Sequence, residues 1–290
     1  MPASSVQKFL ATLAFVLALG LLVVGCGSSD DDASGNGTAA AANCEPGELP
    51  TRADGVLTVA TDRPAYPPYF EDDDPANGEG FESAVAYAIA DELGYPAAKV
   101  KWTTEPFNSS YAPGPKDFDF DLNQISITPP RKKAVDFSAP YYRANQAVLA
   151  LKDSEVAQAT SLEELQDAAL GVQIGTTSLE AAEEVIEPSS RPEVFNNSTD
   201  VTTALKNGQI DAIVVDLPTA LYLTAVEIPE ATVVGQFSAP GGDQWGALLA
   251  KDSELTACVS TAVEELESSG ELEALTTKWM SQAAGAPELQ

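Results

Sequence analysis

The sequence predicts an α/β fold with mostly parallel sheets, and three observations support this prediction. Short apolar runs alternate with amphipathic stretches from residue 55 to residue 279. Gly or Pro often stands between them, and such alternation is typical of parallel sheets covered by helices. About 245 residues follow the N-terminal segments, which suffices for one large or two medium domains.

The first half of this region combines apolar strands with one amphipathic helix. Residues 55–61 form a run rich in Val, Leu and Thr, which predicts a buried strand. Apolar residues recur with helical spacing over residues 81–93, and Gly94 ends that helix. Pro, Gly and Ser make residues 108–116 a loop. Further strands are expected at residues 100–102, 118–127 and 147–151.

The second half repeats the alternation. Ser161 and Glu164 have the spacing of a capping box, which predicts a helix over residues 161–167. Gly208 ends a helix predicted over residues 200–207. Strands are expected at residues 170–174, 193–196, 210–215, 232–235 and 245–250, and helices at residues 177–185, 218–223, 254–268 and 272–279.

The N-terminus has the parts of a secretory signal peptide, which we place at residues 1–25. Lys8 supplies the basic start, and an apolar run extends from residue 9 to Gly25. A transmembrane anchor is the alternative. The run is slightly shorter than the roughly 20 residues of a full span, and no basic cluster follows it.

The residues Val23-Val24-Gly25-Cys26 resemble the bacterial lipobox, which implies that Cys26 is acylated and becomes the new N-terminus. Each buried CH₂ contributes about 0.8 kcal/mol, so several acyl chains anchor a protein without a spanning helix. Residues 26–43 consist mainly of Ser, Gly, Ala and Asp, which predicts a flexible linker.

The composition excludes several classes of function. The formal net charge of −29 argues against nucleic acid and anionic lipid headgroups as partners, and solubility outside the cell is the preferred explanation of this charge. The chain contains no His, which removes His-based triads and His metal ligands. We therefore expect neither a metal nor another cofactor.

Three cysteines remain to be assigned, namely Cys26, Cys44 and Cys258. If Cys26 carries lipid, the other two are left in an oxidising compartment. We expect a disulfide between Cys44 and Cys258. Two buried free thiols are the alternative.

Charged and hydroxyl side chains follow several predicted strands. Arg131 comes after two prolines at a strand end, where its planar fork matches a carboxylate, although a surface ion pair is the commoner use of Arg. Gly175, Thr176 and Thr177 lie between a strand and a helix, where backbone N–H groups bind anions. An ordinary N-cap is the alternative there.

Acidic and aromatic residues occupy similar positions. Asp216 ends an apolar strand and can accept from an ammonium group, or cap the next helix. Asp62 follows the first strand in the same way, ahead of Tyr66. Phe107 and Tyr111 could hold a ligand side chain between them, and core packing is the alternative.

Taken together and in order, these segments resemble the bacterial extracellular solute-binding family that serves polar amino acid ABC importers. The resemblance covers residues 43–280. It is carried by Thr61-Asp62, Tyr66-Pro67-Pro68, Gly80-Phe81-Glu82, Asp121, Ser126-Ile127-Thr128-Pro129-Pro130-Arg131, Val135-Asp136-Phe137-Ser138-Ala139-Pro140-Tyr141-Tyr142, Gly171-Val172-Gln173-Ile174-Gly175-Thr176-Thr177, Ala204-Leu205-Lys206-Asn207-Gly208-Gln209-Ile210-Asp211-Ala212 and Val214-Val215-Asp216-Leu217-Pro218.

The resemblance implies a two-lobed periplasmic-binding-protein fold of type II, with two hinge crossings and a ligand cleft between the lobes. Lobe one would comprise residues 44–142 and 238–283, and lobe two residues 143–237. Residues 284–290 would form a disordered tail.

The resemblance also implies roles for individual residues. Arg131 would bind the α-carboxylate of a free amino acid, with Ser126 and Thr177 beside it. Asp216 would bind the α-ammonium group from the opposite lobe. The residues facing the ligand side chain would be Asp62, Tyr66 and Phe107.

The chain departs from the family pattern at two places. Asn123 and Gln124 replace a small Ser/Gly run, and their amides, with Asp62, suggest a polar rather than an aliphatic ligand. Residues 108–116 replace the helix that usually follows the aromatic Phe107.

The expected function is that of a monomeric receptor, lipid-anchored on the extracytoplasmic face, which delivers an amino acid to an ABC permease. A sensor without transport is one alternative. A dehydratase on the same fold is another, but the chain offers no His and no obvious catalytic Glu.

Overall fold

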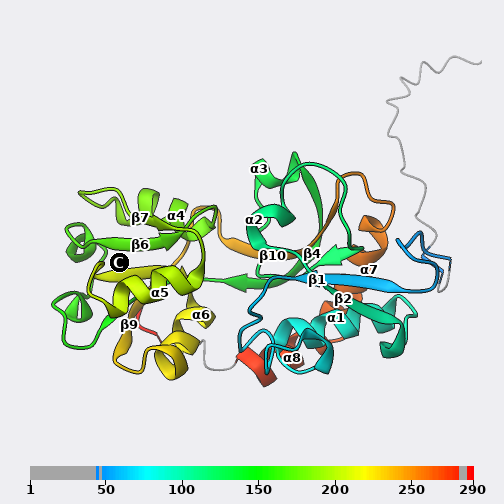
Figure 1. Ribbon diagram of the computed structural model, residues 1–290, viewed down its shortest axis with the longest axis horizontal. Helices are drawn as coiled ribbons and strands as arrows, with labels where there is room; N and C mark the ends of the chain where they lie inside the picture. Colours follow the sequence, from blue (N-terminus) through cyan, green and yellow to red (C-terminus); the bar gives the residue numbers. More distant parts are fainter. Residues whose placement is uncertain (1–43, 46–47, 281–285) are drawn as a thin grey trace, which may run out of the picture. The chain divides into compact units, whose positions relative to one another are not determined.

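The computed structural model describes residues 44–45, 48–280 and 286–290. The predicted signal peptide, Cys26 and the whole predicted linker therefore lie outside the described residues. The described chain forms two five-stranded sheets, each with its own helices, and so has two lobes (Figure 1). No helix in this part of the chain is long and apolar enough to cross a bilayer.

Lobe one contains a sheet with the order β2-β1-β3-β10-β4. Strand β1 runs parallel to β2 and β3, whereas β10 runs antiparallel to β3 and β4. The predicted apolar run therefore forms the strand between two parallel neighbours. The bounds are β1 (Leu57–Thr61), β2 (Val100–Thr104), β3 (Phe120–Asp121), β4 (Val135–Ala144) and β10 (Asp243–Ala250).

Lobe two contains a sheet with the order β7-β6-β8-β5-β9. Strand β6 runs parallel to β7 and β8, and β5 runs antiparallel to β8 and β9. Each sheet thus has two parallel and two antiparallel strand pairs, so the prediction of mostly parallel sheets is wrong, because β5 and β10 run antiparallel to both of their neighbours. The bounds are β5 (Gln146–Leu151), β6 (Leu170–Gln173), β7 (Glu193–Phe195), β8 (Ala212–Asp216) and β9 (Ala231–Phe237).

Helices pack on both sheets and build the cores. In lobe one, α1 contacts α7 and α8, and α7 contacts β4. In lobe two, α4, α5 and α6 all contact β8. The helices are α1 (Phe81–Glu92), α2 (Phe107–Ser110), α3 (Pro129–Lys132), α4 (Thr177–Ala181), α5 (Ser198–Lys206), α6 (Leu217–Tyr222), α7 (Thr256–Ser268) and α8 (Glu271–Met280). A π-helical turn extends α4 over Ala182–Ile186 and another extends α6 over Leu223–Glu227.

Two short crossings connect the strands of the two lobes. The first is Asn145, between β4 and β5, and the second is residues 238–242, between β9 and β10. Because each crossing is only a few residues long, the two lobes are joined at one narrow region, which is the arrangement of a hinge.

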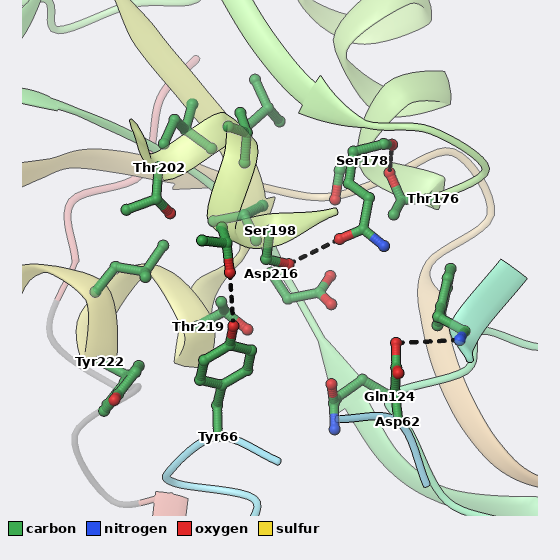
Figure 2. Close-up of a pocket in the computed structure, with 18 of the residues that line it drawn as sticks. Asp62, Tyr66, Gln124, Thr176, Ser178, Ser198, Thr202, Asp216, Thr219 and Tyr222 are labelled. Carbon is green, nitrogen blue, oxygen red and sulfur yellow. Dashed lines mark hydrogen bonds between the residues drawn. The ribbon is translucent and has the colours of Figure 1, made fainter. Parts of the chain in front are cut away.

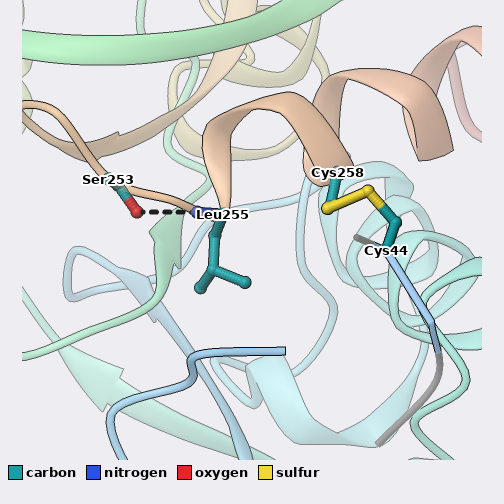
Figure 3. Close-up of a disulfide and its surroundings, with 4 residues drawn as sticks. All are labelled: Cys44, Ser253, Leu255 and Cys258. Atoms are coloured by element: carbon teal, nitrogen blue, oxygen red, sulfur yellow. Dashed lines mark hydrogen bonds between the residues drawn. A yellow bond between two sulfur atoms is a disulfide. The ribbon is translucent and has the colours of Figure 1, made fainter. Parts of the chain in front are cut away.

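The predicted disulfide between Cys44 and Cys258 is present (Figure 3). It joins the start of the described chain to α7, with 5.4 Å between the two Cα atoms. Cys258 is buried in the core of lobe one. A bridge of this kind stabilises the folded state by about 2–5 kcal/mol relative to the reduced chain.

Most predicted elements are present with ends that differ by at most two residues, but the helix over residues 161–167 is wrong. Only a single 3₁₀ turn, Glu163–Leu165, forms there. Glu164 accepts from the backbone N–H and the hydroxyl of Thr160, not from Ser161. The predicted capping box therefore belongs to a turn that is not continued into a helix.

The strand predicted over residues 118–127 is also much shorter than expected. Only Phe120–Asp121 pairs as a strand, and an isolated bridge joins Ser126 to Trp245. Between them Gln124 adopts a left-handed conformation with φ of 48°, which no regular strand accommodates. The loop predicted at residues 108–116 is wrong at its start, because Phe107–Ser110 forms one helical turn.

Strand β4 is the element that the sequence pattern missed. It contains Pro140, which cannot donate to a neighbouring strand, and its polar and aromatic residues do not alternate regularly. Pro140 stands opposite Gly246 of β10, and the register between the two strands shifts on both sides of Gly246. The irregular pairing accommodates the proline inside the sheet.

The prediction of a disordered tail is wrong for residues 286–290. Gln236 of β9 donates its N–H to Pro287 O at 2.8 Å and accepts from Leu289 N–H at 2.9 Å. Leu289 is buried in the core of lobe two. A Cβ atom on Gly235 would lie 2.6 Å from Leu289 Cγ, so glycine is needed where the tail crosses β9. The segment has no periodic pattern of its own, because contacts with β9 and the core of lobe two hold it in place.

We predict that Leu289→Ala lowers the free energy of unfolding by roughly 2–3 kcal/mol, because it empties a buried apolar site. Urea denaturation followed by circular dichroism measures this change. Val226→Ala is the matched control, since Val226 is 59% exposed and its truncation should cost less than about 0.5 kcal/mol. Equal effects of both substitutions would show that the tail does not stabilise lobe two.

Candidate ligand-binding site

A cavity of about 210 Å³ lies between the two lobes. Figure 2 shows Asp62, Tyr66 and Gln124 of lobe one facing Ser198, Thr202 and Asp216 of lobe two across it. The segments after β1, β6 and β8 contribute side chains to its wall. Ligand sites in open α/β sheets lie at such carboxyl ends of strands, so this cavity is the candidate site.

Arg131 lies at the cavity with its guanidinium group almost fully buried. Thr128 caps α3 by accepting from the Arg131 N–H, and two prolines begin that helix. The guanidinium carbon lies 4.6 Å from the ring centre of Tyr111 and 5.5 Å from that of Phe107. The two rings therefore fix the plane of the guanidinium group.

The hydrogen bonds of Arg131 join the two lobes. Nη1 donates to Ser126 O at 2.8 Å in lobe one, and Nη2 donates to Gly175 O at 2.9 Å in lobe two. Burial lowers the pKa of Arg131 from its usual value, so the charge is poorly solvated there. Among the described residues Arg131 makes no salt bridge. It can therefore bind an anionic group in the cavity.

Hydroxyl groups from both lobes meet beside Arg131. Ser126 Oγ lies 3.2 Å from Thr177 Oγ1, and Thr177 donates to Asp243 Oδ2 at 2.8 Å. Thr176 caps α4 by accepting from Leu179 N–H. The N-cap alternative thus holds for Thr176, whereas Thr177 is held by a carboxylate at the lobe boundary.

Asp216 is one of two acids joined through a buried amide. Gln146 Nε2 donates to Asp216 Oδ1 at 2.6 Å and to Asp243 Oδ2 at 2.9 Å. Burial, followed by the charge of Asp243, holds the pKa of Asp216 well above its usual range. Asp216 makes no side-chain capping bond to α6. A cation bound beside Asp216 would therefore stabilise its ionised carboxylate.

The first strand and α2 place two further predicted residues in the wall. Asp62 Oδ2 accepts from the Phe107 N–H at 3.1 Å and Oδ1 accepts from the Arg63 N–H at 2.6 Å. The Asp62 carboxylate thereby fixes the start of α2, and the Phe107 ring lines the cavity. Tyr66 lines it as well, and its hydroxyl lies 3.0 Å from Thr199 Oγ1 of lobe two.

Asn123 and Gln124, where the chain departs from the family pattern, both line the cavity. The side-chain nitrogen of Asn123 is buried without a hydrogen-bond partner among the described residues. Gln124 is held by Glu82, which accepts from its backbone N–H at 2.7 Å and from its Nε2. Glu82 is fully buried, and burial raises its pKa to about 7.

Two secondary candidates do not line the cavity. Tyr111 stacks on the outer side of Arg131, and Gly175 offers its carbonyl oxygen to the same guanidinium group. The Tyr111 hydroxyl lies 3.5 Å from Gly175 O. Both residues therefore contact Arg131, which itself lines the cavity.

Sequence reasoning missed most of the wall that lobe two contributes. Residues of α5 and α6 supply hydroxyl groups, and the Tyr69 hydroxyl lies 2.7 Å from Thr219 Oγ1 across the lobes. Hydroxyl residues recur with helical spacing at the start of α5, which is a signal that could have identified this face. The missed lining residues include Tyr69, Gln173, Ser178, Ser198, Thr199, Thr202, Thr219 and Tyr222.

Residues 57–282 match the family of bacterial extracellular solute-binding proteins, family 3. The chain belongs to this family. Its two-lobed α/β fold is that of type II periplasmic binding proteins.

Several family members are similar to this chain over most of their length. The arginine-binding extracellular protein ArtP of Bacillus subtilis is 33% identical over 217 residues, which cover 73% of this chain and 82% of ArtP. The L-cystine-binding protein TcyJ of Escherichia coli K12 is 30% identical, with coverage of 78% and 82%. These relatives are binding proteins.

Solved structures show the same similarity. An ancestral arginine-binding protein bound to arginine has 32% sequence identity and a TM-score of 0.63, and the match covers 78% of this chain and 98% of that one. An ancestral amino acid-binding protein, described as a precursor of cyclohexadienyl dehydratase, has 33% identity and a TM-score of 0.63, with coverage of 78% and 95%.

Proposed function

We propose that this protein binds a free amino acid between its lobes and delivers it to an ABC permease. One observation carries the proposal: Arg131 and Asp216 face the same cavity from different lobes, and neither has a described salt-bridge partner. A carboxylate at Arg131 and an ammonium group at Asp216 would satisfy both charges. A free amino acid carries these two groups on one carbon atom.

The remaining charges of the wall favour a polar or cationic ligand side chain. The Asp, Glu, Lys and Arg residues lining the cavity are three acids and two bases, namely Asp62, Asp216, Glu227, Arg131 and Lys206. If Arg131 binds the α-carboxylate of the ligand and Asp216 binds its α-ammonium group, two acidic residues and one basic residue remain for the ligand side chain. A positively charged or hydrogen-bonding side chain fits that balance better than an acidic or aliphatic one.

Binding would close the cleft because the ligand contacts both lobes. A ligand stabilises the closed state only through its higher affinity for that state. The zwitterion supplies this difference, since its two charged groups are bound by different lobes. The contacts of Tyr66 with Thr199 and of Tyr69 with Thr219 add two hydroxyl pairs across the same boundary.

The wall supports binding rather than catalysis. The chain has no His, and its most perturbed wall acid, Asp216, is held by Gln146 beside a second carboxylate, Asp243. That environment fits a fixed acceptor for an ammonium group. We expect any amino acid that binds to dissociate unchanged. We also expect no product to form from cyclohexadienyl substrates.

We predict that Arg131→Ala weakens amino acid binding by about 2–5 kcal/mol, because it removes a buried, charge-assisted contact. Isothermal titration calorimetry measures the change. Arg143→Ala is the matched control, because Arg143 is exposed and lies outside the cavity wall. An unchanged Kd for Arg131→Ala would refute the carboxylate site.

We predict that Asp216→Asn weakens amino acids far more than carboxylic acids that lack the α-amino group. The ligand ammonium group should also lower the raised pKa of Asp216, so wild-type binding should release protons and strengthen as pH rises toward that pKa. Calorimetry in buffers of different ionisation enthalpy measures the protons released. Equal weakening of both ligand types, or proton release that persists in Asp216→Asn, would contradict the ammonium role.

The proposed delivery depends on residues outside the described part of the chain. We propose that the signal peptide at residues 1–25 directs export and that lipid on Cys26 anchors the protein at the extracytoplasmic face. Residues 26–43 would then tether a monomeric receptor near its permease.

We predict that Cys26→Ser releases the protein from the membrane fraction and reduces cellular uptake of its amino acid, while calorimetry shows unchanged affinity. Radiolabelled uptake and cell fractionation measure both effects. Membrane retention of Cys26→Ser would refute the anchor, and unchanged uptake after deletion of the gene would refute delivery.

A further inference from the structure

Gln124 occupies an unusual backbone conformation in the cavity wall. Its φ is 48°, a left-handed value that side chains other than glycine adopt rarely and at an energetic cost. Neighbouring contacts must therefore hold it there. Its side chain lines the cavity beside Asp62 (Figure 2).

Glu82 supplies those contacts from behind the cavity wall. Its Oε1 accepts from the Gln124 backbone N–H and from the Tyr141 hydroxyl, and its Oε2 accepts from Gln124 Nε2. The Glu82 side chain is fully buried in the first turn of α1 and does not line the cavity. Its side-chain hydrogen bonds connect it to the cavity wall through Gln124.

The contact with Glu82 determines which end of the Gln124 amide is available. Above its pKa of about 7 the Glu82 carboxylate has no proton to donate, so the Gln124 amide turns its nitrogen toward Glu82. The carbonyl oxygen of the amide is then left for a ligand. The Asp62 carboxylate in the same wall is also an acceptor.

We propose that Gln124 is a specificity-determining residue that selects ligand side chains bearing N–H donors, and that Glu82 is the positioning residue that orients its amide. This inference rests on the proposed function, because it concerns the side chain of a bound amino acid. A guanidinium or ammonium group can donate to the Gln124 carbonyl oxygen. An acidic side chain would place its own acceptors against those of Gln124 and Asp62.

Glu82→Gln tests the inference because it should reverse the Gln124 amide. The new side-chain oxygen would accept from the Gln124 backbone and from Tyr141, as Oε1 does now. Its nitrogen would replace Oε2 and would donate to Gln124, whose amide must then turn its carbonyl inward and its nitrogen toward the ligand. The preference of arginine over glutamate should fall by about tenfold or more.

A double-mutant cycle separates this reorientation from the loss of the Glu82 charge. The Kd values of arginine, citrulline and glutamate are measured by calorimetry for wild type, Glu82→Gln, Gln124→Gly and the double variant. Glycine accommodates the left-handed backbone at residue 124. We expect Glu82→Gln to change the arginine-to-glutamate ratio about tenfold with Gln124 present and less than about threefold in the Gln124→Gly background.

Glu79→Gln is the matched control, because Glu79 is exposed, lies close to the start of α1 and is outside the cavity wall. It should leave the ratio unchanged. Thermal unfolding confirms that each variant is folded. If Glu82→Gln does not fold, the Gln124→Gly variant alone must still lower the arginine-to-glutamate ratio, and a ratio equal to that of wild type overturns the inference.

The other outcomes are equally decisive. The same change of ratio in both backgrounds, or uniform weakening of all three ligands, would assign Glu82 a purely electrostatic or structural role and overturn the inference. In both cases the proposed function would still hold, provided that the wild-type protein binds a free amino acid. Failure of wild type to bind any free amino acid would overturn the proposed function and the inference together.

Discussion

The Arg131 guanidinium group is the contact on which the arrangement of the cleft depends. Its two terminal nitrogens donate to carbonyl oxygens of different lobes, and two aromatic rings hold its plane. Burial removes water from this cation, and no described carboxylate forms a salt bridge with it. The group is therefore both a link between the lobes and a charge without a described salt-bridge partner in the cavity wall.

The same exclusion of water raises the pKa values of several acids around the cavity. Burial raises the pKa of Glu82 to about 7 and that of Asp216 well above its usual range. Asp121 is fully buried, neither of its side-chain oxygens has a hydrogen-bond partner among the described residues, and burial raises its pKa strongly as well. A site with these buried acids gains most from a ligand that brings positive charge, since each acid is costly to ionise alone.

The errors of sequence reasoning have a common cause in long-range contacts. Strand β4 contains Pro140, and only the irregular pairing opposite Gly246 of β10 makes it part of a sheet. Gln124 ends the strand predicted around it because Glu82, 42 residues earlier, holds its backbone. The tail at residues 286–290 has no pattern of its own, and its order comes from Gln236 and the core of lobe two.

The sequence by itself determined the α/β class, the alternation of strands and helices and the position of Asp216 at the end of a strand, and it predicted the disulfide. Apolar periodicity, proline and glycine positions and cysteine count are local properties, which a single chain displays directly. Only the tertiary structure decided which side chains share the cavity. The Gln146 link between Asp216 and Asp243 and the Glu82 support of Gln124 join residues that are distant in sequence, and their geometry exists only in the folded chain.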